Sequence, residues 1–192
     1  MTRFWWVRHG PTHARTMVGW SDLPADLSDH PAIARLTAFL PQDAVLVSSD
    51  LIRATATADA VQANRLRLAN DDRLREMHFG DWELRSHAEV EAETPDVIRA
   101  FWDSPGQVRP PGGESWNDLS ARIWAATDRL ITDFAGRNIV IVAHFGAILC
   151  ALQRAANLTP EQVFSHRLDN LSVTELVHTP DAWQVGRINH IA

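Results

Sequence analysis

The chain has 192 residues, of which 45% are hydrophobic and 22% charged, an ordinary globular composition that argues against disorder and fibrous repeats. Its 18 basic and 24 acidic residues give a net charge of −6, which disfavours nucleic acid and anionic membranes as partners. A chain of this length is expected to form one domain with a sizeable core.

The chain contains no lysine, so all 18 basic residues are arginine. This absence excludes a Walker A phosphate loop, a pyridoxal Schiff base and a protein kinase, because each of them requires a lysine. Cys150 is the single cysteine and cannot form an internal disulfide or a multi-cysteine zinc site. No segment has the pattern of a signal peptide or a membrane span, which predicts a cytoplasmic protein. The oligomeric state is left open.

Short apolar runs, each followed by a helical pattern, recur along the chain. The runs lie at 4–7, 44–47 and 138–143. They are continuous rather than alternating, which is typical of parallel strands buried on both faces. Helices are expected at about 29–40, 50–63, 115–134 and 147–156. The fold class is therefore α/β, with a mostly parallel central sheet flanked by helices on both faces.

Residues 77–113 interrupt this regular pattern. We expect two short helices there, near 86–93 and 95–102, and a cap insertion over one edge of the sheet. The insertion holds seven acidic residues and three arginines, a net charge of −4. Near the end of the chain, β-rich segments at 171–177 and 183–188 flank a Thr-Pro-Asp turn and predict a β-hairpin.

Two histidines each follow a predicted strand. The first run leads straight into Arg8-His9-Gly10, and the run at 138–143 leads straight into His144-Phe145-Gly146. Because ligands bind at the carboxyl ends of the strands in α/β sheets, both side chains are expected to converge on one crevice. The run at 44–47 leads into Ser48-Ser49-Asp50, which is typical of a helix N-cap and offers backbone N–H groups to an anion.

Arg53 then falls in the first turn of that helix, where a cation opposes the helix dipole, a local conflict of the kind expected at functional sites. Together with Arg8, it indicates a phosphate site, because guanidinium groups bind phosphate oxygens bidentately. Neutral His9 is the predicted nucleophile, since nearby guanidinium groups disfavour its protonation. Glu76 is the predicted proton donor to the leaving alkoxide, and water then hydrolyses the phosphohistidine.

Five blocks carry a family resemblance, in chain order. They are Arg8-His9-Gly10 with Thr12 at the usual hydroxyl position, Ser49 through Ala58, Leu74 through Glu83, Pro111-Gly112-Gly113-Glu114-Ser115, and Asp169-Asn170-Leu171-Ser172. In these blocks, which span nearly the whole chain, the sequence resembles the histidine phosphatase superfamily, also called phosphoglycerate mutase-like. Glu114 and Ser115 also precede the long predicted helix, where we expect them to act as its cap.

The resemblance implies roles for individual residues. His9 is the phosphorylated nucleophile, Arg8 and Arg53 clamp the phosphate, His144 is a second positive contact and Glu76 is the proton donor. No metal and no cofactor are implied. The sequence departs from the family pattern at Pro11, at Phe145, which stands where glycine is usual, and at Arg15, which replaces an asparagine and is an added candidate for phosphate binding.

Other functions compete with a metal-independent phosphatase. A zinc hydrolase could use the four-residue spacing of His9 and His13. Such spacing requires a helix, however, and Gly10 and Pro11 disfavour a helix there. A catalytically silent phospho-ligand binding protein and a mutase that transfers the phosphoryl group both stay open, although the short cap favours hydrolysis. The expected substrate is a small phosphate ester. Its identity is not fixed by the sequence, and an acidic cap disfavours polyanions.

Overall fold

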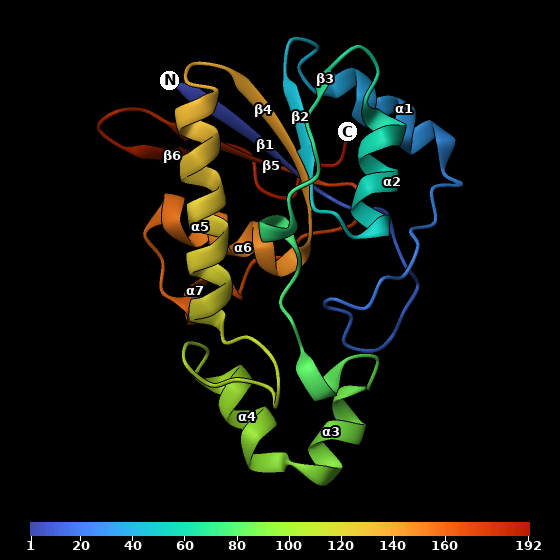
Figure 1. Cartoon of the computed structure of the whole chain (residues 1–192), viewed down its shortest axis with the longest axis vertical. Coiled ribbons are helices and arrows are strands. Elements are labelled where there is room, and N and C mark those ends of the chain that lie inside the picture. The colour runs from blue at the N-terminus through green and yellow to red at the C-terminus, as the bar shows by residue number, and fades with distance from the viewer.

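The computed structural model describes all 192 residues and is built on one mixed sheet of six strands (Figure 1). The spatial order is β3-β2-β4-β1-β5-β6. The strands are β1 (Thr2–Arg8), β2 (Val45–Ser48), β3 (Leu66–Arg67), β4 (Asn138–Ala143), β5 (Val173–His178) and β6 (Trp183–Val185). The first four in spatial order run parallel, while β5 pairs antiparallel with both β1 and β6. The predicted hairpin is therefore confirmed.

Seven α-helices accompany the sheet. They are α1 (His30–Phe39), α2 (Ile52–Val61), α3 (His87–Glu93), α4 (Pro95–Asp103), α5 (Trp116–Asp133), α6 (Phe145–Ala156) and α7 (Pro160–Val163). Two short 3-10 helices lie at Asp72–Leu74 and Gly80–Trp82. The predicted helices are present within a few residues of their expected bounds. The sequence pattern missed β3 and α7, because two and four residues are too few to show a period.

The central strands send alternate side chains into two separate hydrophobic clusters. Ile139 and Ile141 of β4 join the larger cluster, which α5 and α6 contribute to, whereas Val140 and Val142 join a smaller cluster with α1 and α2. This burial on both faces is why β4 is a continuous apolar run in the sequence. Figure 1 shows the same division, with α5 and α6 on one side of the strands and α1 and α2 on the other.

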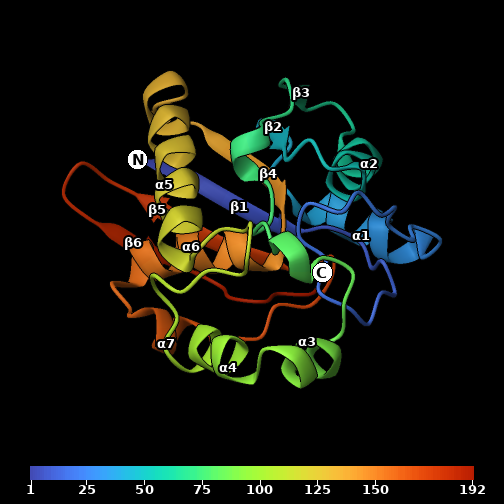
Figure 2. The same cartoon turned by 60° about the horizontal axis from the view of Figure 1, so that its bottom comes forward.

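The cap insertion lies at one end of the molecule, where α3 and α4 form the lower part of Figure 1 and come forward in Figure 2. Trp82, Ile98 and Phe101 from this segment are buried in the larger hydrophobic cluster. A capping box starts α3, with the Ser86 hydroxyl accepting the Glu89 N–H and the Glu89 carboxylate accepting the Ser86 N–H. The cap is thus packed onto the same core as the sheet.

Two local predictions are wrong. Ser48-Ser49-Asp50 does not cap α2, which begins after Leu51 without a side-chain cap; the Ile52 N–H instead donates to Asp22 Oδ1 at 2.6 Å. A carboxylate from a distant loop thus occupies the helix end that was expected to bind an anion. Ser115 caps α5 as expected, in a capping box with Asp118, but Glu114 does not take part and pairs with Arg122.

None of the helices is both long enough and apolar enough to cross a membrane.

Candidate active site

The pairing of β1 with β4 places the two predicted histidines side by side. The parallel register aligns Arg8 with Ala143, so His9 and His144 leave the two strands at the same level. Their ring centroids are 5.1 Å apart. The predicted convergence of these side chains at the carboxyl end of the sheet is therefore present in the structure.

The backbone around His9 is held from two sides. The Asn170 side-chain amide donates to the His9 carbonyl at 2.8 Å, and the Gly10 N–H donates to the Thr57 hydroxyl of α2 at 3.0 Å. The His9 ring places Nδ1 2.7 Å from the Gly10 carbonyl oxygen. A carbonyl oxygen can only accept, so Nδ1 carries the proton and Nε2 keeps a free lone pair.

Arg8 and Arg53 are both oriented by backbone carbonyls. The Arg53 guanidinium, 1% exposed, donates to the carbonyls of Gly19 and Ser21 at 2.6 and 2.9 Å. The Arg8 guanidinium donates to the Leu168 carbonyl at 2.6 Å. Neither arginine donates a hydrogen bond to a carboxylate, but the charge of Glu76 is close enough to favour the charged form of both guanidinium groups, while burial lowers the pKa of each overall.

Buried polar atoms without a hydrogen-bond partner concentrate here. The chain has six such side-chain atoms, and four of them belong to three residues at this place: Arg8 Nε, Arg53 Nε and both ring nitrogens of His144. Leaving a buried polar group unpaired costs about 1–3 kcal/mol, and more for a charged group. Such a concentration of polar atoms without partners is characteristic of a site that satisfies them with a ligand.

Burial and the arginines keep both imidazoles neutral. Burial, followed by the charge of Arg53, lowers the pKa of His9 to about 3. Burial and then the neighbouring His9 and Arg53 hold the pKa of His144 well below its ordinary value. The resemblance implied a positive contact from His144, but in the ligand-free protein this ring is neutral. Neutral His9 matches the expectation for a nucleophile, with burial rather than the guanidinium groups as the largest cause.

Glu76 lies at the same site and its carboxylate is fixed by the backbone. Oε1 accepts the Met77 N–H at 2.9 Å, and Oε2 accepts the Gly146 N–H at 3.0 Å at the start of α6. A Cβ atom on Gly146 would lie 2.4 Å from Oε1, so only glycine fits beside this carboxylate. The main-chain approach of Gly146 therefore sets the position of Glu76.

A cavity of about 220 Å³ opens among these groups. Its lining includes Arg8, His9, Thr12, Arg53, Glu76, Phe79 and Phe145. Thr12 thus joins the predicted residues, while His144 is fully buried and does not line the cavity. Arg15 is exposed and does not line the cavity, although its neighbours Ala14 and Thr16 do. The structure therefore does not bring Arg15 to the others.

Sequence reasoning missed Glu83, which organises the loop that holds Arg53. Its half-buried carboxylate accepts the N–H groups of Gly19, Trp20, Ser21 and Phe79 and the Ser21 hydroxyl, at 2.6–3.2 Å. Burial opposes ionisation, yet these hydrogen bonds lower the pKa of Glu83 overall. The carbonyls of the same loop, at Gly19 and Ser21, bind Arg53. The only sequence signal was its place at the end of the Leu74 to Glu83 block.

Arg122 plays a similar part for the segment that carries Glu76. Its guanidinium forms two hydrogen bonds with the Glu114 carboxylate, at 3.0 and 2.7 Å. It also donates to the carbonyls of Arg73, Arg75 and Glu76 at 2.8–3.2 Å. Glu114 in turn accepts the His78 N–H at 3.0 Å. The ion pair therefore fixes residues 73–78 against α5, and nothing in the spacing of the sequence pointed to it.

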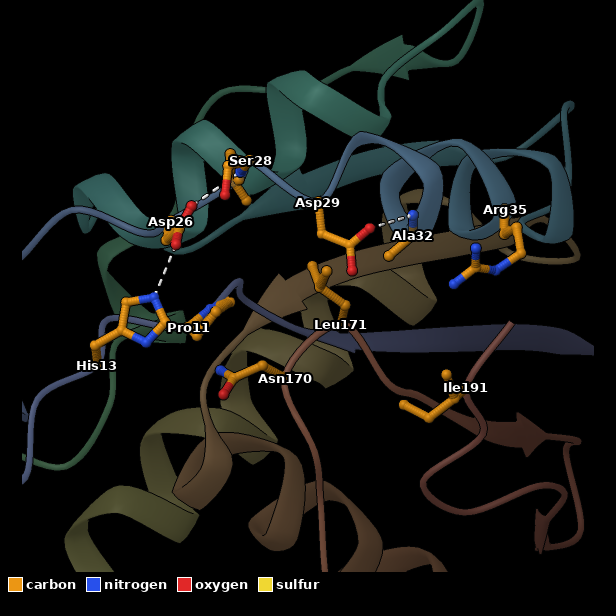
Figure 3. A pocket seen from close by; sticks show the side chains of 11 residues that line it. Pro11, His13, Asp26, Ser28, Asp29, Ala32, Arg35, Asn170, Leu171 and Ile191 are labelled. Carbon is orange, nitrogen blue, oxygen red and sulfur yellow. Dashed lines mark hydrogen bonds and ion pairs between the residues drawn. The ribbon is translucent and has the colours of Figure 1, made fainter.

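The largest cavity, about 450 Å³, lies next to this site but does not contain its chemistry. Figure 3 shows it between Pro11, Asp29, Asn170 and Leu171. Its charged groups already have partners in the chain: His13 Nε2 lies 2.8 Å from Asp26 Oδ2, Asp29 accepts the Ala32 N–H, and Arg35 donates to the Ala192 carbonyl. Unlike the cavity beside His9, it offers no unpaired buried donor.

The structure also separates His9 and His13, the pair whose spacing suggested a zinc site. His9 is buried, whereas His13 is exposed and faces Asp26. No group of three or more His, Cys, Asp or Glu side chains has the arrangement to hold a metal ion. Cys150 is buried on α6, accepts a hydrogen bond from the Ser120 hydroxyl, and has its pKa raised by burial, as expected of a packing residue.

Comparison with known proteins identifies the family. The model of the histidine phosphatase superfamily, branch 1, matches residues 4–191, so the chain belongs to this superfamily. A glucosyl-3-phosphoglycerate phosphatase of Mycolicibacterium vanbaalenii is 36% identical over 162 residues, which cover 78% of this chain and 71% of that protein. Three mycobacterial relatives, 35% identical over 135 residues, are much longer: the match covers 69% of this chain but spans only 37% of their length.

Solved structures agree in fold. The structure of Bacillus stearothermophilus YhfR has a TM-score of 0.91 at 26% identity, covering 100% of this chain and 98% of that one. A mycobacterial glucosyl-3-phosphoglycerate phosphatase in complex with inorganic phosphate has a TM-score of 0.83 at 30% identity, covering 98% and 97% of the two chains. The predicted α/β fold and the resemblance to the superfamily are both confirmed.

The lowered pKa values predict how stability depends on pH. In the unfolded chain both histidines take up a proton near pH 6.5, whereas folded His9 does so only near pH 3. Stability present at pH 7 is therefore lost as the pH falls from about 6.5 towards 3, by up to about 1.4 kcal/mol per pH unit for each histidine. Urea unfolding of His144→Gln between pH 7 and 4 is expected to show a shallower loss than the unchanged protein. Equal slopes would contradict the assignment of a neutral, buried His144.

A second prediction concerns Glu83. In Glu83→Gln the side-chain NH₂ cannot accept hydrogen bonds, so the loop at 19–21 loosens and Arg53 loses its fixed position. We expect inorganic phosphate to bind about tenfold more weakly, equivalent to about 1.4 kcal/mol, as measured by calorimetry. The control is Glu93→Gln, which removes an exposed carboxylate of the cap that pairs with Arg85. Equal affinity of the two variants would show that Glu83 does not position Arg53.

Proposed function

We propose that this protein hydrolyses phosphate monoesters through a phosphohistidine intermediate on His9, without a metal. The observation that carries the proposal is the concentration of buried polar atoms without partners, from Arg8, Arg53 and His144, around a neutral imidazole. A phosphoryl group supplies acceptor oxygens to these donors and an electrophilic phosphorus to the free Nε2 lone pair.

In the first step, Nε2 of His9 attacks phosphorus and the bond from phosphorus to the ester oxygen breaks. Arg8 and Arg53 stabilise the charge that develops on the non-bridging oxygens, and a bound dianion favours a proton on His144 as a further donor. Protonated Glu76 gives its proton to the leaving oxygen, which departs as an alcohol. The hydrogen bond from His9 Nδ1 to the Gly10 carbonyl stabilises the positive charge that develops on the ring.

In the second step, water attacks the phosphorus of the phosphohistidine. The carboxylate of Glu76 takes a proton from this water, and the bond between phosphorus and Nε2 breaks. Inorganic phosphate leaves, while neutral His9 and protonated Glu76 are regenerated. One carboxyl group thus serves first as general acid and then as general base, as microscopic reversibility requires.

Similarity supports hydrolysis of a small ester. The relative at 36% identity is named a glucosyl-3-phosphoglycerate phosphatase, and one structural neighbour contains inorganic phosphate. Phosphoglycerate mutase-type transfer and phospho-ligand binding without turnover are the alternatives that the test below distinguishes.

The test of the proposal is phosphate release from p-nitrophenyl phosphate in the presence of EDTA. The expected result is turnover that resists the chelator and is lost in His9→Ala. His13→Ala is the matched control, because it removes an exposed histidine four residues along the same loop. Binding of phosphate without turnover would replace the proposal with a binding function, and turnover abolished by EDTA would replace it with metal-dependent hydrolysis.

The role of Glu76 predicts a dependence on the leaving group. Glu76→Gln cannot donate a proton, so kcat/KM for an alkyl phosphate is expected to fall by roughly 10²–10⁴-fold. For p-nitrophenyl phosphate, whose leaving group needs no proton, we expect a loss of only a few-fold in the phosphorylation step. Rapid-quench measurement of phosphoenzyme formation with both esters separates the cases. An equal loss with both would remove the proton-donor role.

A further inference from the structure

A second, smaller cavity adjoins the proposed site. It has a volume of about 50 Å³ and shares Glu76, Phe79 and Phe145 with the cavity beside His9. Because Glu76 lines both, an ester oxygen that receives its proton lies at the junction of the two cavities. The group attached to that oxygen therefore extends into the smaller one.

Six of the nine residues that line this second cavity are aromatic. Besides the shared residues, they consist of Met77, Phe101, Trp102, Trp116, Gly146 and Phe164. The rings pack on one another: Trp116 and Phe164 have centroids 4.6 Å apart, and Phe101 and Trp102 4.9 Å. The Trp116 indole N–H is already bonded to Gln153 at 2.7 Å. Glu76 is thus the single charged side chain of the cavity.

The three arginines of the cap are paired with carboxylates. Within the cap, Arg85 pairs with Glu93, Arg99 with Glu91, and Arg109 with Asp118 at the start of α5. Arg8, whose guanidinium lies 5.5 Å from the Phe145 ring centroid, lines only the cavity beside His9. A leaving group with a carboxylate or a second phosphate would therefore lose its hydration without gaining a cationic partner.

We propose that the preferred substrates are monophosphate esters of alcohols that are apolar next to the ester oxygen, with this group bound in the aromatic cavity. The inference rests on the proposed phosphatase function and names its substrate class. Phe145 lines both cavities and gives this chain an aromatic surface between them. Esters of anionic alcohols are poor substrates for the same reason.

The experiment compares three esters of similar size with alkoxide leaving groups: propyl phosphate, glycerol 1-phosphate and 3-phosphoglycerate. We expect kcat/KM for propyl phosphate to exceed that for glycerol 1-phosphate by about tenfold, with 3-phosphoglycerate lowest. Trp102→Arg places a cation at the cavity and is expected to raise the ratio of 3-phosphoglycerate to propyl phosphate by about tenfold. Val97→Arg is the control, since Val97 lies on the same helix at 38% exposure, against 39% for Trp102, and does not line the cavity.

Each outcome decides the inference. Preference for propyl phosphate, shifted only by Trp102→Arg, supports it. Equal or better turnover of glycerol 1-phosphate or 3-phosphoglycerate by the unchanged protein overturns it while leaving the phosphatase function intact, as does an equal shift in both arginine variants. Absence of turnover with all three esters and with p-nitrophenyl phosphate overturns the proposed function itself, and the inference with it.

Discussion

The parallel pairing of β1 with β4 is the constraint on which the candidate site depends. Its register aligns Arg8 with Ala143 and so ends both strands at one level, with His9 and His144 next to each other. Alternate side chains of β4 are buried in the two hydrophobic clusters on opposite faces of the sheet. This packing fixes the register, since a shift by one residue would move each side chain to the other cluster. The geometry of the histidines is therefore a consequence of core packing.

The site concentrates positive charge and unpaired donors, and the surrounding chain stabilises this arrangement. Burial of Arg8, Arg53 and two neutral imidazoles, with polar atoms that lack hydrogen-bond partners, is unfavourable in the free protein. Backbone carbonyls orient the guanidinium groups, and Glu83 organises the loop that supplies two of those carbonyls. Arg122 and Glu114 hold the segment of Glu76 in the same manner. An anionic ligand supplies hydrogen-bond acceptors to these groups and offsets this unfavourable free energy, which gives the site its affinity for phosphate.

Strand exits and ordered sequence blocks were sufficient to predict the fold class, the main elements and most of the site. His9 and His144 could be found because each directly follows a buried strand. Arg15 was placed by position in a motif, but its side chain is exposed because loop geometry is not fixed by spacing. Glu83 and Arg122 act through contacts between segments more than 45 residues apart, which no local pattern encodes. The contact of Asp22 with the start of α2, across 30 residues, is likewise not encoded in a local pattern.

The central claim is that His9 is the residue that becomes phosphorylated. Its most direct test is to mix the protein with a ³²P-labelled phosphate ester, quench with alkali within milliseconds, and map the label by mass spectrometry. The account predicts a base-stable, acid-labile phosphoryl group on His9 that disappears as inorganic phosphate is released. Label on another residue, or turnover with no phosphoprotein at any time, would contradict it.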